Sequence, residues 1–300
     1  DLIKTLEGIS NKHIKRIAIV GGVVRDALLS SKEEKVYIKS RDVDILVEGS
    51  AYHLALELEE KLGKNRVSNI QAHQAYDTVA MNIDGYPIDI ASAREELYQI
   101  PGENPIVSPC ILENDLKRRD FSINSIALDI KGMNLIDLFH GEECLQKGIV
   151  ECLHEKSVEE DPTRIIRAAR YCSRFGFSLG GSSRNQIYIT IQNWPWNWNF
   201  QDLPNTAPPS LGTRLKMEMN LLFKEDSWKV ALGYLQGWGG FSILDDRLCS
   251  DTFWPRRILW AHRLKVEPLT AFISIARKPL ELAKRLQLEG NQQKLIKESL

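Results

Sequence analysis

The sequence lacks the features that mark a membrane, secreted or zinc-binding protein. It contains no run of about eighteen apolar residues, which a transmembrane helix would need. Its first residues, DLIKTLEGISNKH, have neither the apolar centre nor the cleavage site of a signal peptide. The five cysteines are irregularly spaced and form no CxxC pair, so neither a disulfide framework nor a zinc site is predicted. We expect a cytoplasmic protein with reduced cysteines and no membrane partner.

An excess of charge of one sign is also missing. The net charge is −1, which argues against binding nucleic acid through a uniformly basic surface. Two local basic clusters remain, and each is either a solvated helix face or a track for phosphates. One is a row at helical spacing, and the other lies after residue 251, where basic residues outnumber acidic ones. The row is Arg164, Arg167, Arg170 and Arg174, and Arg256 and Arg257 begin the second cluster. Of these, we take Arg174, Arg256 and Arg257 as candidate RNA contacts.

The first part of the chain alternates strand and helix patterns. Hydrophobic residues make up 43% of the 300 residues, enough for two or three compact units. We predict strands at 16–20 and 41–49, helices after the glycine pair and at 51–63, a hairpin around the Asp84-Gly85 turn, a loop at 103–110 and a helix at 112–128. Past Gly132, helical patterns dominate. Ser157 followed by Glu160 predicts a capping box ahead of a strong helix in 161–177.

Two acids, Asp42 and Asp44, stand one residue apart in an apolar strand pattern. Alternation along a strand places both side chains on one face, where like charges repel unless a cation lies between them. The pair therefore indicates either a metal site or an edge strand with exposed acids. Upstream, Gly21 and Gly22 lie where a strand turns into a helix, and Arg25 follows. A glycine turn at a helix N-terminus can approach phosphates closely, although such a turn is also a common connection between a strand and a helix.

Five motifs together resemble a known family. GGVVRDALL, RDVDI, DLKRRDFSINSIAL, LIDLF and EDPTRIIRAARYCSRFGF follow the order and spacing of class II tRNA nucleotidyltransferases and bacterial poly(A) polymerases, which include the CCA-adding, CC-adding and A-adding enzymes. The resemblance spans Ile17 to Phe177. It implies an α+β fold, with a small mixed β-sheet in a catalytic head (1–131), a helical neck that recognises the base (132–223) and a helical body (224–300) that contacts tRNA and has either a full or a shortened tail.

The resemblance also implies roles for individual residues. Asp42 and Asp44 would bind two Mg²⁺ ions and direct catalysis, and Asp161 and Arg164 would form a fork, on one helix, that accepts C and A but refuses U and G. Alternatively, Asp161 and Arg164 form an ordinary i,i+3 salt bridge with no role in base recognition, worth about 0.2 to 0.5 kcal/mol. The remaining nucleotide-binding candidates are Gly21, Gly22, Arg25, Arg119, Asp120, Asn124, Arg167 and Arg170.

The activity implied is template-independent addition of C, A or both, from CTP and ATP, to the 3′ end of tRNA with release of pyrophosphate. A poly(A) polymerase and a non-catalytic RNA-binding relative are the alternatives, and the intact acids argue against the second. The choice among CCA, CC and A addition stays open, as does the oligomeric state. So does the role of the Trp-rich segment 194–200, which either stacks on RNA or packs internally. A flexible loop that bears on this choice is expected within 91–109.

Overall fold

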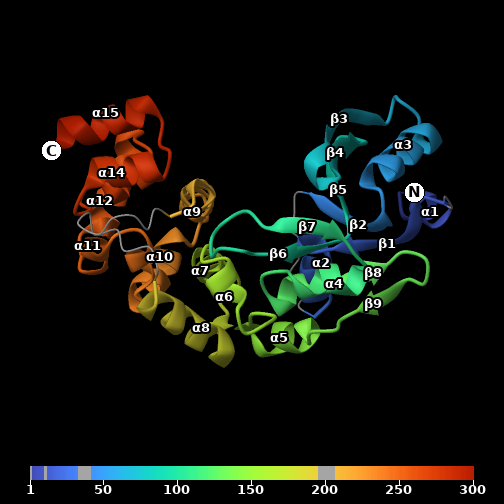
Figure 1. The fold of residues 1–300 in the computed structure, drawn as a ribbon, viewed down its shortest axis with the longest axis horizontal. Helices are drawn as coiled ribbons and strands as arrows, with labels where there is room; N and C mark the ends of the chain where they lie inside the picture. The colour runs from blue at the N-terminus through green and yellow to red at the C-terminus, as the bar shows by residue number, and fades with distance from the viewer. Residues whose placement is uncertain (1, 10–11, 33–41, 195–206) are drawn as a thin grey trace. The chain divides into compact units, whose positions relative to one another are not determined.

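A computed structural model describes residues 2–9, 12–32, 42–194 and 207–300 (Figure 1). The chain divides into two compact units. The first unit comprises residues 1–97 and 106–147, and the second comprises 98–105 and 148–300. No helix in the described part of the chain is both long enough and apolar enough to span a membrane.

The first unit is built on a mixed sheet of seven strands in the order β3-β4-β5-β2-β1-β8-β9. Strands β2 and β5 run parallel, and the other neighbouring pairs are antiparallel. Strands β6 and β7 form a separate hairpin. The elements are α1 (Leu2–Glu7), β1 (Ile14–Val20), α2 (Gly22–Lys32), β2 (Val43–Gly49), α3 (Ala51–Leu62), β3 (Val67–His73), η1 (Gln74–Tyr76), β4 (Thr78–Ile83), β5 (Tyr86–Ser92), β6 (Arg94–Leu97), β7 (Ile106–Pro109), α4 (Leu112–Lys117), η2 (Ser122–Asn124), β8 (Ala127–Asp129), β9 (Asn134–Ile136) and α5 (Gly141–Lys147).

Most of the predicted elements of this unit are confirmed, including the hairpin of β4 and β5. The predicted loop at 103–110 is partly wrong, because β7 pairs with β6 there. The predicted helix over 112–128 is also wrong beyond Lys117, where α4 ends and η2 and β8 follow. Phe121, Ile123 and Ile126 are all completely buried. A single helix would spread these three side chains around its axis, so the chain has to turn in order to bury them together.

The two faces of the sheet are covered differently. On one face, Ile45 of β2 and Ile90 of β5 are buried, and α3 packs against β4 and β5 through its own buried Leu54 and Leu58. Buried and more exposed residues alternate along β5, which is typical of a strand with one core-facing side, whereas the middle of β2 is buried on both faces.

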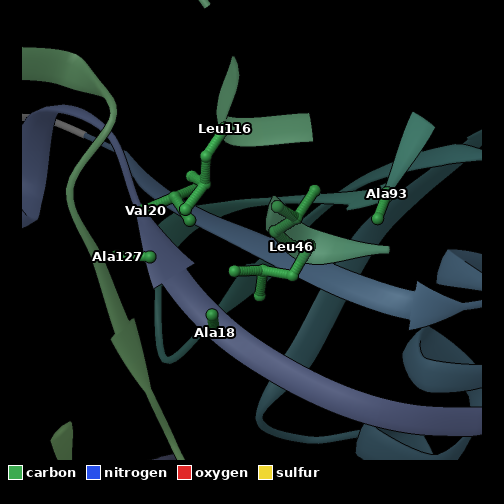
Figure 2. Close-up of a cluster of buried hydrophobic side chains, with 7 residues drawn as sticks. Ala18, Val20, Leu46, Ala93, Leu116 and Ala127 are labelled. Carbon is green, nitrogen blue, oxygen red and sulfur yellow. The ribbon is translucent and has the colours of Figure 1, made fainter. Parts of the chain in front are cut away.

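The opposite face is only partly covered, by α4. Leu112 and Leu116 of α4 pack with Leu46 of β2 and with residues of β1 and β8 in one buried cluster. Figure 2 shows Leu116 beside Val20, with Leu46 close by. Asp44 lies two residues before Leu46 and therefore on the same face. This side of the core thus borders directly on the predicted metal site.

The second unit is almost entirely helical, as the resemblance implied. Its only strands in the described part, β10 (Ile149–Val150) and β11 (Ser178–Leu179), pair in parallel. Its helices are α6 (Ser157–Glu160), α7 (Arg164–Phe175), α8 (Gly181–Gln192), α9 (Pro209–Phe223), α10 (Trp228–Gly237), η3 (Gly240–Ile243), α11 (Asp246–Cys249), α12 (Trp254–Leu264), α13 (Pro268–Ile273), α14 (Pro279–Arg285) and α15 (Gly290–Ser299).

Three predictions concern segments of this unit outside its long helices. The capping box at Ser157 is wrong: Lys156 occupies the cap of α6 without a side-chain hydrogen bond, because the buried Ser157 hydroxyl accepts from Arg164 instead. Of the Trp-rich segment, only Trp194 is described, and the rest lies outside the described residues. The predicted flexible loop coincides with the β6–β7 hairpin, whose tip, 98–105, belongs to this unit.

Candidate active site

Three carboxylates meet on the partly covered face of the sheet. Asp44 of β2 lies opposite Asp89 in the parallel pairing with β5, and Asp42 immediately precedes β2. One oxygen from each of the three lies within 4.8 Å of the others. We call Asp42, Asp44 and Asp89 the acid cluster. The sequence placed two of these acids together, and the register of the parallel strands brings in the third.

The acid cluster is electrostatically unfavourable as it stands. Burial, followed by the neighbouring charge of Asp42, raises the pKa of Asp44 to about 6. The pKa of Asp89 is raised as well, first by burial and then by Asp42. The charges of Arg119 and Arg25 act against the rise at Asp44 without cancelling it. A divalent cation would relieve this repulsion, and carboxylate oxygens are the donors that hard cations such as Mg²⁺ prefer. The residues present therefore fit a metal ion.

Gly21 sits directly against the acid cluster. Its φ of +73° is a left-handed conformation, and a Cβ there would lie 2.8 Å from Asp44 Oδ2 and 3.7 Å from Arg119 Nη1. Any other residue would be both strained and obstructed. Gly22 then begins α2, whose first turn closes with a hydrogen bond from Arg25 N to Gly21 O. The glycine pair thus joins the end of β1 to a helix N-terminus beside the carboxylates.

Arg25, Asn124 and Asp120 form one buried hydrogen-bonded chain. Arg25 Nη1 donates to Asn124 Oδ1 at 2.5 Å, and Asn124 Nδ2 donates to Asp120 Oδ1 at 3.0 Å. Arg25 also makes a bidentate contact with Asp26 Oδ1, at 2.7 and 2.8 Å. The structure therefore brings together three of the predicted nucleotide-binding side chains. Arg25 is only 3% exposed. It acts on the acid cluster through its charge, which lowers the pKa of Asp44.

Arg119 is held by a fully buried acid. Its Nε and Nη2 atoms donate to Asp115 Oδ1 at 3.3 and 3.1 Å, while Arg118 Nη2 donates to the other oxygen at 2.7 Å. Asp115 is 0% exposed, so it fixes the direction of the Arg119 guanidinium. This arrangement directs a positive charge at Asp44.

A pocket of about 390 Å³ extends from the acid cluster over the open part of the sheet. We call it the sheet pocket. Beyond Asp44, Asp89 and Arg119, its lining comes from β2, β4 and β5, with one residue each from β1 (Val20) and β3 (His73). Residues that face it and were not predicted as site residues are His73, Thr78, Ala80 and Ala91.

The predicted base-reading fork has a different local structure. Asp161 is not on a helix with Arg164: it caps the end of α6, and α7 begins only at Arg164. Asp161 Oδ1 accepts from the Thr163 amide and hydroxyl at 3.1 and 2.6 Å. Arg164 Nη1 contacts Ser157. The predicted geometry of the fork is therefore wrong, and the two side chains have separate partners.

The row of arginines on α7 lies on one face, as the spacing predicted, but it is not a free cationic track. Arg167 and Arg170 each donate to Glu218 of α9, at 2.7 and 2.5 Å. Arg174 donates to Glu225 at 2.5 Å. The two carboxylates compensate two of the four positive charges of the row. The roles of the three arginines toward nucleotide or RNA stay predictions.

The two arginines of the second basic cluster differ from each other. Arg257 contacts the buried Asp251 and donates to Ala271 O at 3.0 Å. Arg256 is exposed, one residue earlier on α12. Arg257 therefore has a structural role, whereas Arg256 presents its charge to solvent.

Asp89 is the site residue that sequence reasoning missed. The signal was present: PIDIA places one acid among apolar residues at strand alternation, as RDVDI does. What was missing was the pairing of β2 with β5. Two intervening strands, β3 and β4, hide that pairing in the order of the sequence.

A mixed sheet that presents a carboxylate cluster beside a glycine turn, followed by a helical unit, is the arrangement that the resemblance to nucleotidyltransferases implies. Residues 17–151 match the model of the Poly A polymerase head domain. The resemblance found in the sequence motifs is confirmed over this part of the chain.

Individual relatives agree with this assignment. The chain is 40% identical over 175 residues to an A-adding tRNA nucleotidyltransferase of Aquifex aeolicus, covering 57% of this chain and 20% of that protein. It is 31% identical over 232 residues to a CC-adding tRNA nucleotidyltransferase of Deinococcus radiodurans, covering 76% and 55%. The solved apo form I of a CCA-adding enzyme superimposes with a TM-score of 0.74 at 25% identity, covering 99% of this chain and 68% of that one. The chain thus spans from one fifth to just over half of these two curated relatives.

Proposed function

We propose that this protein adds C, A or both to the 3′ end of tRNA, using CTP and ATP and releasing pyrophosphate. The observation that supports this most directly is the acid cluster beside Gly21 and Arg119, in a head whose relatives are tRNA nucleotidyltransferases. The partners would be the tRNA 3′ end and the two nucleotides. A tRNA substrate would place the protein in the cytoplasm.

We propose that the acid cluster holds two Mg²⁺ ions. When bound, the ions would supply Lewis-acid activation of the attacking hydroxyl and charge neutralisation of the leaving pyrophosphate. Asp42 and Asp44 are the proposed catalytic ligands, and Asp89 joins them. The repulsion that raises the pKa of Asp44 supports this role, because ionised oxygens held close together favour a divalent cation.

The triphosphate would lie on the side of the acid cluster where positive groups gather. Gly21 and Gly22 allow phosphate oxygens to approach the backbone at the start of α2, while Arg119 and the buried Arg25 supply fixed charge. Asp120 and Asn124, linked to Arg25, would position the ribose. In the reaction, the RNA 3′ oxygen forms a bond to the α-phosphorus and loses its proton to water. The bond from that phosphorus to the oxygen of pyrophosphate breaks.

Asp161 and Arg164 are the proposed readers of the base. Within the described residues, Asp161 Oδ1 takes all the hydrogen bonds that this carboxylate accepts, so Oδ2 is available for the amino group that C and A share. Uracil and guanine present a carbonyl acceptor where C and A have the amino donor, and a ring N–H where C and A have an acceptor nitrogen. A mismatch would leave buried polar groups unpaired, at about 1 to 3 kcal/mol each. Arg167 and Arg170 would support this region from the same helix.

The test uses labelled CTP or ATP with three acceptors: tRNA ending before CC, tRNA ending after CC, and an unrelated RNA. Incorporation into the first two, or into one of them, identifies CCA, CC or A addition. Long A tails on the unrelated RNA would indicate a poly(A) polymerase instead. Absence of incorporation with every acceptor would refute the proposal. Asp44→Ala should abolish incorporation, while the control Asp84→Ala, at an exposed turn paired with Arg66, should not.

A further inference from the structure

We propose that the sheet pocket binds the 3′-terminal nucleotide of the RNA acceptor, with Thr78 and His73 as contact residues. This inference rests on the proposed function and adds the location of the second substrate. It starts from the order of residues across the sheet.

A single row of paired residues crosses the site. Val20 of β1 pairs with Asp44, Asp44 with Asp89, Asp89 with Ala80 of β4, and Ala80 with Gln71 of β3. The glycine turn directly follows Val20, so it lies at one end of this row. Ala80 lies at the other side of the two carboxylates, about 10 Å from Asp44 at the usual spacing of strands, ~4.8 Å. Asp44 and Asp89 therefore lie between the glycine turn and the end of the sheet pocket that Thr78, Ala80 and Ala91 line.

The chemistry requires such a separation. In an in-line displacement, the attacking oxygen and the leaving pyrophosphate lie on opposite sides of the α-phosphorus. The leaving group belongs at the glycine turn and Arg119, where backbone N–H groups and fixed positive charge are concentrated. The attacking 3′ hydroxyl must then arrive from the side of β5, β4 and β3. The end of the sheet pocket lined by His73, Thr78 and Ala80 lies on that side.

The lining of the sheet pocket suits a nucleotide of the acceptor better than a triphosphate. Ala80 and Ala91 are small and leave room above the strands, and Arg119 is its only arginine or lysine within the described residues. Thr78 and His73 are paired across β3 and β4 and face the pocket. Their hydroxyl and imidazole groups can exchange hydrogen bonds with a ribose 2′-OH, the group that distinguishes RNA from DNA.

The decisive variant is Ala80→Leu, which fills the sheet pocket. Its matched control is Asn82→Leu, which adds the same side chain on the same face of the same strand but outside the pocket lining. The measurement is the Kd of a fluorescent RNA stem-loop with a tRNA-like 3′ end, by anisotropy, together with the KM for the nucleotide. Ala80→Leu should weaken RNA binding by roughly tenfold or more and leave the nucleotide KM within about twofold. Asn82→Leu should change neither.

Thr78→Val provides a second test of the acceptor site, because it removes the hydroxyl without adding volume to the sheet pocket. It should reduce the preference for an acceptor ending in a ribonucleotide over one ending in a 2′-deoxynucleotide, with the wild type as reference. If wild type incorporates nucleotides but Ala80→Leu binds the RNA as tightly as Asn82→Leu does, the acceptor site is refuted while the proposed function stands. If wild type incorporates nothing into any acceptor, both proposals are refuted together.

Discussion

Replacing Asp44 with asparagine should stabilise the metal-free protein at alkaline pH. The pKa of Asp44 is raised from 3.8 to about 6, mainly by burial and then by the charge of Asp42. The native state therefore holds this proton at pH values where the unfolded chain has released it. The contribution of Asp44 to stability is greatest below pH 4, falls as the pH rises toward 6, and stays reduced above that. A pKa difference of about 2 corresponds to at most about 3 kcal/mol. Asparagine has nearly the same shape and cannot ionise, so it removes this cost.

Hydrogen exchange read by mass spectrometry on peptides from β1, β2 and β5 is the suitable assay, because all seven tryptophans lie at 194–260 and report on the second unit. In EDTA at pH 8, the opening free energy of Asp44→Asn should exceed that of wild type by up to about 3 kcal/mol, and the difference should vanish near pH 4. Saturating Mg²⁺ should remove most or all of this difference, since wild type gains binding energy, about 2.7 kcal/mol at a hundredfold excess over Kd.

Asp84→Asn is the control for this prediction. Asp84 is exposed at a turn, and its hydrogen bond with Arg66 lowers its pKa. Its replacement should lower stability at pH 8, the opposite sign, and should not affect the response to Mg²⁺. Two results would refute the electrostatic account of the acid cluster. In the first, Asp44→Asn is no more stable than wild type at pH 8 in EDTA. In the second, its greater stability persists at pH 4.

Three further predictions follow from contacts described above. Gly21→Ala should destabilise the first unit by about 1 to 2 kcal/mol and weaken metal binding, because its methyl group would meet a carboxylate oxygen at 2.8 Å; denaturation and metal titration would measure this. Glu218→Gln should cost up to about 3 kcal/mol in the second unit, because it removes the nearer of the two carboxylates that pair with the buried Arg170 and leaves only Glu225; tryptophan fluorescence in urea would report this loss. Arg256→Gln should weaken RNA binding in a salt-dependent way with little change in stability, whereas Arg257→Gln should lower Tm; equal effects of the two would contradict the assignment.

The sequence was informative wherever the necessary residues lie close together along the chain. The turn at Gly21, the strand that carries Asp42 and Asp44, and the helical face of the arginine row are local patterns, and the structure contains each of them. Partners that come from distant segments were not visible. Glu218 lies 51 residues beyond Arg167, and nothing local to the row indicated that this glutamate of α9 would pair with two of its arginines.

The same limit explains the mistaken geometry of the base-reading pair. The spacing of Asp161 and Arg164 fits one helical face, but Asp161 accepts hydrogen bonds from the backbone and hydroxyl of Thr163 and so remains outside α7. Side chains such as Asp can compete with helix formation in this way. Propensity alone could not decide between a residue inside the helix and one that precedes it.

The parallel pairing of β2 with β5 makes cation binding a reporter of folding. Asp44 and Asp89 are 45 positions apart in the chain, so a divalent ion can be held by both only after that non-local pairing has formed. Contacts of this kind are characteristically late and slow to form. Stopped-flow refolding followed with a luminescent lanthanide in place of magnesium would therefore time the closure of the central strands, separately from the helices that emit the tryptophan signal.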